Sequence, residues 1–444
     1  MIDGAYLRHA LKRAMACALL APALAGTFAL LATLVLSLPD EPIAANILDR
    51  PDVLLSRRAD NGRVIDADTE CIGLSVGMSG GAPVRAGETA FARAMAPRSA
   101  YGCEPFLAFL ETGDPYEIRE YFRYWHGHLV VTRPALSVLA YNDLRGLTFT
   151  ACVLLLGAAT WRIGRDFGAA AGLAFVLPFF VLNALGYWVV ATKATTFALA
   201  VGACLAFSRR GDRPAPLVAY FALGSLTAFF DFLTAPALIF CLPTIVWVMY
   251  RRRGAAAAGG ADGKADRNAD WRVDWRDVIA LGAFWTAGYA GLWAAKIAIA
   301  AMVIGPAAWA DAMGQAAFRI RGESDLVDAY WPGLALYRNV AALKSLWAPV
   351  AIGLFVAAPL IRADARAGLV SIWRRGRLPL ALAAAPLAFL ELLSNHAQIH
   401  AAFTHLNFAP ICFLAGLALF GRTAPLLLPE GKPAKPANAV PASE

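Results

Sequence analysis

The sequence predicts an all-α integral membrane protein of about ten transmembrane helices, with a long external first loop that carries membrane-parallel helices. Hydrophobic residues make up 59% of the 444 residues and charged residues 16%, whereas soluble domains usually carry about 25% charged residues. The apolar residues also cluster in runs near the roughly 20-residue length that crosses a bilayer. The basic residues lie in short loops between these runs, so the net charge of +8 does not indicate nucleic-acid binding.

The first span is expected at 14–38, directly after Arg8, Lys12 and Arg13. Its 25 residues exceed the apolar core of a signal peptide, which favours an uncleaved span. Pro178, Pro236 and Pro243 interrupt later runs, which membranes tolerate where protein or water satisfies the freed backbone groups. The remaining spans are expected at 144–161, 168–190, 194–208, 215–231, 233–250, 278–301, 346–361, 378–394 and 406–421.

Arginines gather in one set of short loops, and the short loops on the other side are poor in basic residues. The positive-inside rule therefore places both termini and the 251–277 linker in the cytoplasm, and the 39–143 loop outside. Richness in Ala, Gly and Arg suggests a high-GC bacterium, and the expected location is the inner membrane. Residues 1–428 form a single transmembrane domain in this interpretation, and 429–444, rich in Pro, Ala and Lys, are predicted to be a disordered cytoplasmic tail. The basic residues on which the orientation rests are Arg162, Arg165, Arg209, Arg210, Arg213, Arg251, Arg252, Arg253, Arg362, Arg366, Arg374, Arg375 and Arg377.

The external loop holds two of the seven cysteines, Cys71 and Cys103. Outside the cytoplasm an oxidising environment allows them to pair, so a disulfide is one of two open possibilities. The other five cysteines fall in apolar runs and are expected to be small core residues.

Five of the six histidines fall in two stretches predicted to face outward. In the first, Asp114 is a good N-cap for an amphipathic helix through 134, which places Arg123, His126 and Arg133 near one face. His128 lies in the same stretch. Phosphate of a substrate is one expected ligand of this basic face, and lipid phosphate at the membrane surface is the alternative.

The second stretch, from Glu391 to Phe408, holds His396, His400 and His405. His396 and His400 are spaced to share a helical face. Three histidines can bind zinc, but the stretch offers no carboxylate or cysteine to complete a site. Phosphate or sugar binding is therefore favoured over a metal, and ordinary interfacial histidines remain the alternative.

Acidic residues mark the outer boundary of the predicted spans. Asp40 and Glu41 directly follow the first span, where a solvated helix end is the alternative to a functional role. Asp231 lies between two apolar runs and is flanked by Phe229, Phe230 and Phe232. Ionisable groups at such depth are costly and indicate function by default.

The run from Arg119 to Arg145, REYFRYWHGHLVVTRPALSVLAYNDLR, resembles a family of uncharacterised bacterial polytopic membrane proteins with a RYWHGY…RP…Y…IR stretch. The run NHAQIHAAFTHLNF, from Asn395 to Phe408, is similar to that family's HSxIHxxFTYR stretch. His126, Arg133, His400 and Thr404 fall on its recurring positions. His405 stands where the family has Tyr, and Asn407 departs too.

The layout also resembles the GT-C class of glycosyltransferases. That resemblance implies an acidic residue just after the first span, a long first external loop and a polyprenyl-phosphate sugar donor. Asp40 and Glu41, followed by the 39–143 loop, fit this plan.

These features predict a GT-C-like glycosyltransferase that moves a sugar from a polyprenyl-phosphate donor to a cell-envelope glycan or lipid acceptor. Asp40 or Glu41 would accept the acceptor's proton, with or without a divalent cation. Arg123, His126, Arg133 and His400 would stabilise the leaving phosphate. The alternatives are a lipid-linked glycan polymerase or ligase, a transporter or flippase, and a non-catalytic envelope-assembly protein. No inverted repeat is found, which counts against transport, and the sequence does not indicate the oligomeric state.

Overall fold

The structure, a computed structural model, is mostly helical. It describes residues 4–55, 67–76, 78, 94–95, 103–112, 118–119, 121–208, 215–258, 275–322, 325, 327–343, 357, 360–361 and 363–423. The helices are α1 (Gly4–Leu36), α2 (Asp40–Leu48), α3 (Pro51–Leu55), α4 (Ala67–Ser75), α6 (Cys103–Thr112), α7 (Leu129–Leu136), α8 (Tyr141–Phe167), α9 (Ala169–Val181), α10 (Leu185–Trp188), α11 (Ala191–Ser208), α12 (Leu217–Phe230), α13 (Pro236–Ala258), α14 (Trp275–Ile304), α15 (Ala307–Ile320), α16 (Leu334–Ala341), α18 (Ala363–Arg375), α19 (Arg377–Leu392), α20 (Ser394–Ile399), α21 (Ala401–Thr404) and α22 (Ala409–Leu419). A 3-10 turn at His405–Phe408 joins the last two helices, and β1 (Ala94–Met95) pairs antiparallel with β2 (Ile118–Arg119).

Membrane-spanning character is clear in the part of the chain that the structure describes. Five helical segments are long and apolar enough to cross a bilayer: Leu11–Leu36, Tyr141–Phe167, Ala191–Ser208, Trp275–Ile304 and Ala401–Leu419. The helices α9 and α12 are apolar but shorter. Most of the span expected at 346–361 lies outside the described residues. The count of about ten spans therefore stays a prediction.

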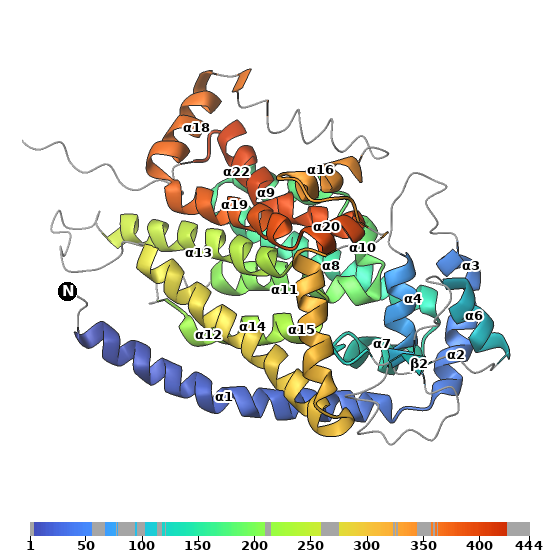
Figure 1. The fold of residues 1–444 in the computed structure, drawn as a ribbon. Coiled ribbons are helices and arrows are strands. Elements are labelled where there is room, and N and C mark those ends of the chain that lie inside the picture. The colour runs from blue at the N-terminus through green and yellow to red at the C-terminus, as the bar shows by residue number, and fades with distance from the viewer. Residues whose placement is uncertain are drawn as a thin grey trace, which may run out of the picture.

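The largest hydrophobic core lies between helices that pack against one another. The helix α11 packs against α8 and α13, and α9 packs against α8 and α22. Trp188 and Trp247 are fully buried there. A second group joins α12 to α14, with α1 beside them along one edge of the molecule (Figure 1). A Cβ atom on Gly224 or on Gly288 would overlap the backbone of the facing helix. These glycines therefore let α12 and α14 approach backbone to backbone, as small residues do between membrane helices.

The predicted external loop forms a separate layer at one end of the helices, where α2, α3, α4 and α6 gather (Figure 1). A disulfide joins Cys71 in α4 to Cys103 in α6, with Cα atoms 5.2 Å apart, so the pairing left open by the sequence is present. Both cysteines are buried in a small apolar cluster with Phe106, Leu107 and Leu136.

The amphipathic helix expected over 114–134 is wrong for residues 118–119 and 121–128, and α7 covers the expected helix from Leu129 onward. Residues 113–117 lie outside the described part, and the backbone from 121 to 128 is irregular up to the start of α7 at Leu129. His126 has a φ of 55°, which a helix does not allow. Tertiary partners replace the helical ones: Gly127 N donates to Phe229 O at 2.9 Å, and the Trp125 indole donates to Leu292 O at 2.8 Å.

The region expected as a cytoplasmic linker, 251–277, is helical at both ends. The helix α13 continues through Ala258, and α14 begins at Trp275. Residues 259–274 lie outside the described part, as does the predicted tail at 429–444.

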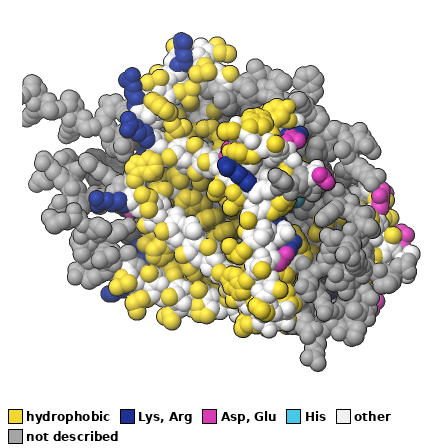
Figure 2. All heavy atoms as spheres, in the orientation of Figure 1, with side chains coloured by type: hydrophobic (Ala, Val, Ile, Leu, Met, Phe, Trp, Pro, Cys, Tyr) yellow, Lys and Arg dark blue, Asp and Glu magenta, His cyan; other side chains and the backbone are white. Residues whose placement is uncertain are grey.

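Charge is unevenly distributed along the helices. In Figure 2 hydrophobic side chains cover the middle of the visible face, Lys and Arg are concentrated toward one side, and Asp and Glu toward the other. The helix α13 shows the same polarity, because it begins just after Asp231 and carries Arg251, Arg252 and Arg253 in its second half. We call these two ends the histidine end, which holds His126, His128 and His396, and the arginine end, which holds Arg162, Arg165 and Arg253.

Candidate functional site

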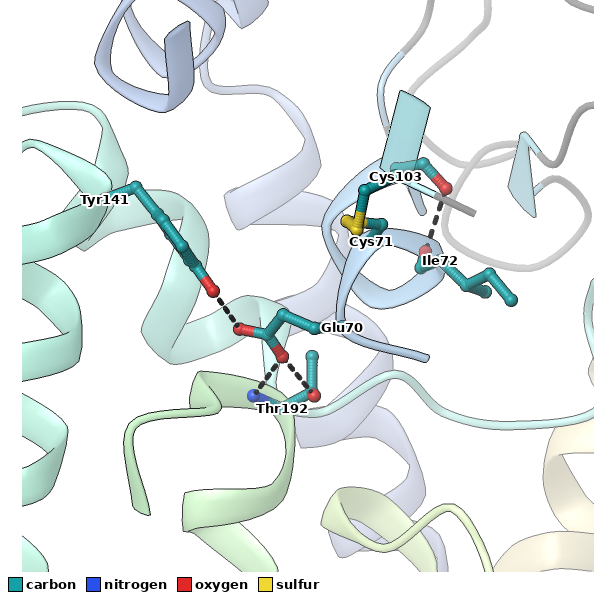
Figure 3. Close-up of a disulfide and its surroundings, with 7 residues drawn as sticks. Glu70, Cys71, Ile72, Cys103, Tyr141 and Thr192 are labelled. Carbon is teal, nitrogen blue, oxygen red and sulfur yellow. Dashed lines mark hydrogen bonds between the residues drawn. A yellow bond between two sulfur atoms is a disulfide. The ribbon is translucent and has the colours of Figure 1, made fainter. Parts of the chain in front are cut away.

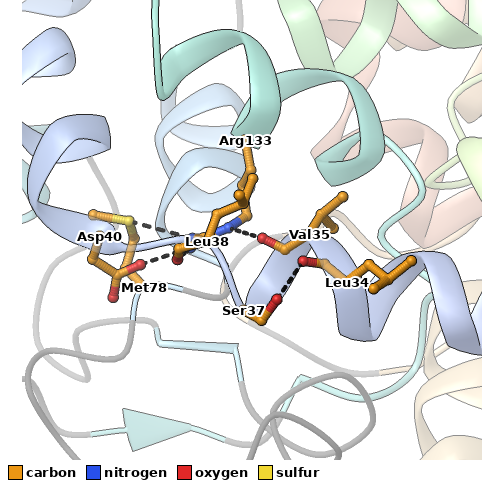
Figure 4. A network of polar contacts seen from close by, with 7 residues as sticks. All are labelled: Leu34, Val35, Ser37, Leu38, Asp40, Met78 and Arg133. Atoms are coloured by element: carbon orange, nitrogen blue, oxygen red, sulfur yellow. Dashed lines mark hydrogen bonds and ion pairs between the residues drawn. The ribbon is translucent and has the colours of Figure 1, made fainter.

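Arg133 joins the end of the first span to the start of the external layer. Its Nε donates to Val35 O at 2.8 Å, and its Nη2 lies 2.8 Å from both Leu38 O and Asp40 Oδ1 (Figure 4). The last carbonyls of a helix have no partner within the helix. Arg133 therefore caps α1 and orients Asp40 at once. The fold thus brings together two of the predicted site residues.

The two candidate bases differ in setting. Asp40 and Glu41 both stand in the first turn of α2, where the helix dipole favours negative charge. Asp40 has a side chain that is 23% exposed and is paired with Arg133. Glu41 is exposed. Of the two, Asp40 is therefore the one whose position the protein controls.

His126 and His128 are buried with the same hydrogen-bonding pattern. His126 Nε2 lies 2.8 Å from Tyr121 O, and His128 Nε2 lies 2.9 Å from Gly73 O. A carbonyl can only accept, so each Nε2 carries the proton and each neutral ring keeps a lone pair on Nδ1. Both Nδ1 atoms are buried and have no hydrogen-bond partner among the described residues.

Burial also determines the charge state of these two rings. It lowers the pKa of His128 to about 4, against smaller raising effects from the Gly73 carbonyl and Glu70. Burial lowers the pKa of His126 well below its usual value, and the neighbouring His128 adds to the effect. Both rings are therefore neutral at pH 7, so each Nδ1 can accept a hydrogen bond from a hydroxyl group.

The two histidine stretches meet on the loop between α12 and α13. The ring of Phe232 lies 5.5 Å from that of His126 and 4.8 Å from that of His128. His396 Nε2 lies 3.0 Å from Leu233 O, the next residue along. Both histidine stretches therefore contact adjacent residues of this loop.

Asp231 stands in the same loop and is 3% exposed. Its Oδ1 accepts from Thr196 Oγ1 at 3.1 Å and from Ala235 N at 3.3 Å. Its Oδ2 is buried and makes no hydrogen bond within the described part of the chain. Leaving a buried oxygen unsatisfied costs free energy, and such atoms concentrate at functional sites.

His400 and His405 have different surroundings, although the sequence grouped them. The His400 ring is half-buried and lies 4.6 Å from that of His396. His405 is buried, with Nδ1 3.1 Å from Ala401 O and Nε2 2.9 Å from Leu182 O. Because both its nitrogens face backbone carbonyls, His405 joins the end of α9 to the 3-10 turn.

Two arginines add positive charge beside the His126 loop, and one of them was not singled out from the sequence. Arg123 Nη1 pairs with Asp311 Oδ2 of α15 at 2.8 Å. Arg319, in the last turn of α15, lies 5.7 Å from the centroid of the Tyr124 ring. Its Nη1 lies 3.4 and 3.5 Å from two oxygens of Gln315. The signal in the sequence was a basic residue ending a short amphipathic helix directly after a span.

Glu70 is a second buried residue that the sequence analysis missed. Its carboxylate accepts from Tyr141 Oη at 3.0 Å and from Thr192 Oγ1 at 2.5 Å (Figure 3). It also accepts from Ala191 N at 3.0 Å. Thr192 N lies 3.3 Å away as well. Glu70 therefore supplies the acceptor for the first N–H groups of α11, which no residue of that helix can satisfy. Its neighbour Cys71 holds α4 in place through the disulfide.

Within the described ranges no group of three or more His, Cys, Asp or Glu is placed to hold a metal ion. No family model, curated protein or solved structure matches the chain. The chemistry of the site is therefore inferred from its own residues. These residues lie at one end of a membrane helix bundle. They are the neutral imidazoles of His126 and His128, the carboxylates of Asp40 and Asp231, and the guanidinium groups of Arg123, Arg133 and Arg319.

Proposed function

We propose that the protein is a GT-C-like membrane glycosyltransferase that transfers a sugar from a polyprenyl-phosphate donor to a glycan or lipid acceptor of the cell envelope. The observation that carries the proposal is the meeting of His126, His128 and His396 on Phe232 and Leu233. It gathers polar groups from three distant segments at one end of an otherwise apolar bundle. Burying polar groups at membrane depth costs free energy, and such groups therefore indicate a ligand-binding role.

Glycosyl transfer needs a proton acceptor for the incoming hydroxyl group and positive charge for the departing phosphate. Asp40, oriented by Arg133, is the proposed base. The lone pairs of His126 and His128 would accept hydrogen bonds from sugar hydroxyl groups. Arg123 and Arg319 are the proposed partners of the phosphate, because each presents a guanidinium beside the same loop.

A turnover assay distinguishes a glycosyltransferase from a transporter or an assembly protein. The purified protein in nanodiscs is given a panel of polyprenyl-phosphate-linked sugars with a lipid-linked acceptor, and released polyprenyl phosphate is measured. We expect release with one donor. Loss of one phosphate-stabilising donor typically costs about a hundredfold in rate, so Arg319→Gln should lower kcat/KM about a hundredfold. The matched control is Arg321→Gln, an exposed arginine two residues further on.

Absence of release with every donor, together with protection of the protein by bound donor, would point to transport or assembly and overturn the proposal. Equal losses in the Arg319 and Arg321 variants would contradict the assignment of Arg319 to the phosphate.

A further inference from the structure

At the arginine end, one carboxylate is shared by three arginines. Asp166, in the last turn of α8, lies 3.0 Å from Arg162 Nε, 3.5 Å from Arg165 Nε and 3.1 Å from Arg253 Nη1. Arg253 belongs to α13, so the cluster also joins two helices. A single negative charge cannot neutralise three guanidinium groups, and the cluster keeps an excess of positive charge.

Aromatic rings hold this cluster in place. Tyr250 Oη lies 2.9 Å from Asp166 Oδ2, and its ring meets that of Phe167 edge-on at 4.9 Å. Arg253 lies over the Phe167 ring at 5.5 Å. Asp166 is 10% exposed, whereas Arg165 and Arg253 are 47% and 49% exposed. The inner partner is thus fixed, and the outer surfaces of two arginines remain open to a ligand.

A fourth arginine approaches from the end of α22. A Cβ atom built on Gly168, two residues after Asp166, would lie 3.5 Å from Arg422 Cζ. Gly168 has a φ of 94°, so glycine suits this turn for its conformation as well. Arg422 is exposed, and its backbone N–H donates to Leu417 O at 2.7 Å. Among the residues that the structure describes, its guanidinium makes no hydrogen bond or ion pair. Arginines from three parts of the chain therefore gather around the turn between α8 and α9.

An apolar stripe on α8 leads from the bilayer to these arginines. Leu147, Leu154 and Trp161 are 56%, 67% and 64% exposed. Their seven-residue spacing places them on one face of the helix, and Arg165 follows Trp161 by one turn. Arg165 also lies 4.8 Å from the centroid of the Trp161 ring. Tryptophan is typical of the membrane–water interface.

From this geometry we infer that the α8–α9 turn is a binding site for the phosphate headgroup of an anionic membrane lipid. The guanidinium groups of Arg165, Arg253 and Arg422 bind the phosphate, and an acyl chain follows Leu154 and Leu147. Basic pockets between membrane helices bind lipid headgroups in this way, and guanidinium groups suit phosphate because they offer paired donors. The apolar stripe selects a lipid over free phosphate, which has no tail to place there. The inference is independent of the proposed enzymatic function.

The test compares two double variants that each remove two positive charges at the arginine end. Arg165→Gln with Arg253→Gln alters the site, and Arg366→Gln with Arg374→Gln, on exposed positions of α18, is the control. The melting temperature of the detergent-solubilised protein is measured at increasing concentrations of phosphatidylglycerol, phosphatidylcholine or inorganic phosphate. Phosphatidylglycerol should raise it in the wild type and the control. A basic residue near a lipid surface contributes about 1 kcal/mol, so the site variant should bind about thirtyfold more weakly.

Equal weakening in the control would show a diffuse charge effect and overturn the site. A similar rise with inorganic phosphate, at the concentration of the lipid, would overturn the lipid as ligand. Should the double variant not fold, Arg165→Gln alone provides the test, because its contact with Asp166 is the longest of the three. About a fivefold loss of affinity is then expected, and no loss would contradict the inference.

Discussion

The guanidinium of Arg133 lies 2.8 Å from the carboxylate of Asp40, across the break between α1 and α2. Because the same guanidinium also binds the carbonyls of Val35 and Leu38, its removal takes a hydrogen-bond donor from each of three acceptors. Arg133→Ala should therefore lower the stability of the protein as well as its activity.

We expect Arg133→Ala to lower the free energy of unfolding by about 2 to 3 kcal/mol, the range for buried groups that lose a charged partner. Thermal unfolding followed by tryptophan fluorescence measures it. The matched control is Arg50→Ala, because Arg50 pairs with Asp52 at the surface, where the two side chains are 55% and 62% exposed. Exposed pairs contribute little, so a loss as large in the control would contradict the argument.

Glu70→Gln should destabilise the protein although it preserves size. The amide group cannot accept all the bonds that Ala191, Thr192 and Tyr141 now make to the carboxylate. Hydrogen bonds to a buried charged group contribute about 1.5 to 3 kcal/mol, and a loss of that order is expected in thermal unfolding. Glu111→Gln, on the exposed surface of α6, is the control. An unchanged melting temperature for Glu70→Gln would show that the carboxylate cap of α11 does not contribute to stability.

The Cys71–Cys103 bond should resist alkylation until the protein is reduced. It closes a sequence separation of 32 residues, and loop-closure entropy predicts about 3 to 4 kcal/mol of stability from such a bond. Replacing both cysteines with Ser should lower the melting temperature accordingly. Mass shift with a thiol reagent reports the pairing, and the five other cysteines, labelled after denaturation, serve as internal controls. Labelling of Cys71 without reduction would refute the bridge.

His128 should make the stability of the protein depend on pH. Its pKa is lowered to about 4 in the fold, because of burial, against about 6.5 when unfolded. The unfolded chain therefore takes up the proton first as pH falls, and the stability that His128 contributes above pH 6.5 is lost toward pH 4. About 2 kcal/mol is expected to be lost by pH 5.

His128→Gln should flatten the decline of melting temperature between pH 7 and 5, with a remainder from His126, whose pKa is lowered in the same direction. His400→Gln, at a half-buried position, is the matched control variant. A His128→Gln profile as steep as that of the wild type would mean that another group governs the acid transition.

The orientation in the membrane is tested by reporter fusions at residue 70, residue 260 and the C-terminus. The positive-inside rule predicts outside, inside and inside. An inside signal at residue 70 would move the candidate site to the cytoplasmic face and remove the basis for a donor at the outer face.

The class of protein follows from the sequence alone, because membrane spans depend on local composition. A run such as 14–38 must bury its backbone polar groups within itself, and only a helix does so in lipid. The sequence also identified Cys71 and Cys103 as the one candidate pair for a disulfide, because they are the only cysteines in the predicted external loop.

Which polar residues meet was decided by the tertiary structure. The expected helix around His126 does not form, and instead the Gly127 N–H donates to Phe229 of α12 and the Trp125 indole donates to Leu292 of α14. Asp40 lies in α2, yet its guanidinium partner is in α7. An irregular segment satisfies its backbone and side chains through distant parts of the chain, so local patterns do not encode its contacts. The apolar runs of the sequence therefore indicated the membrane helices, and long-range hydrogen bonds determined which polar residues meet.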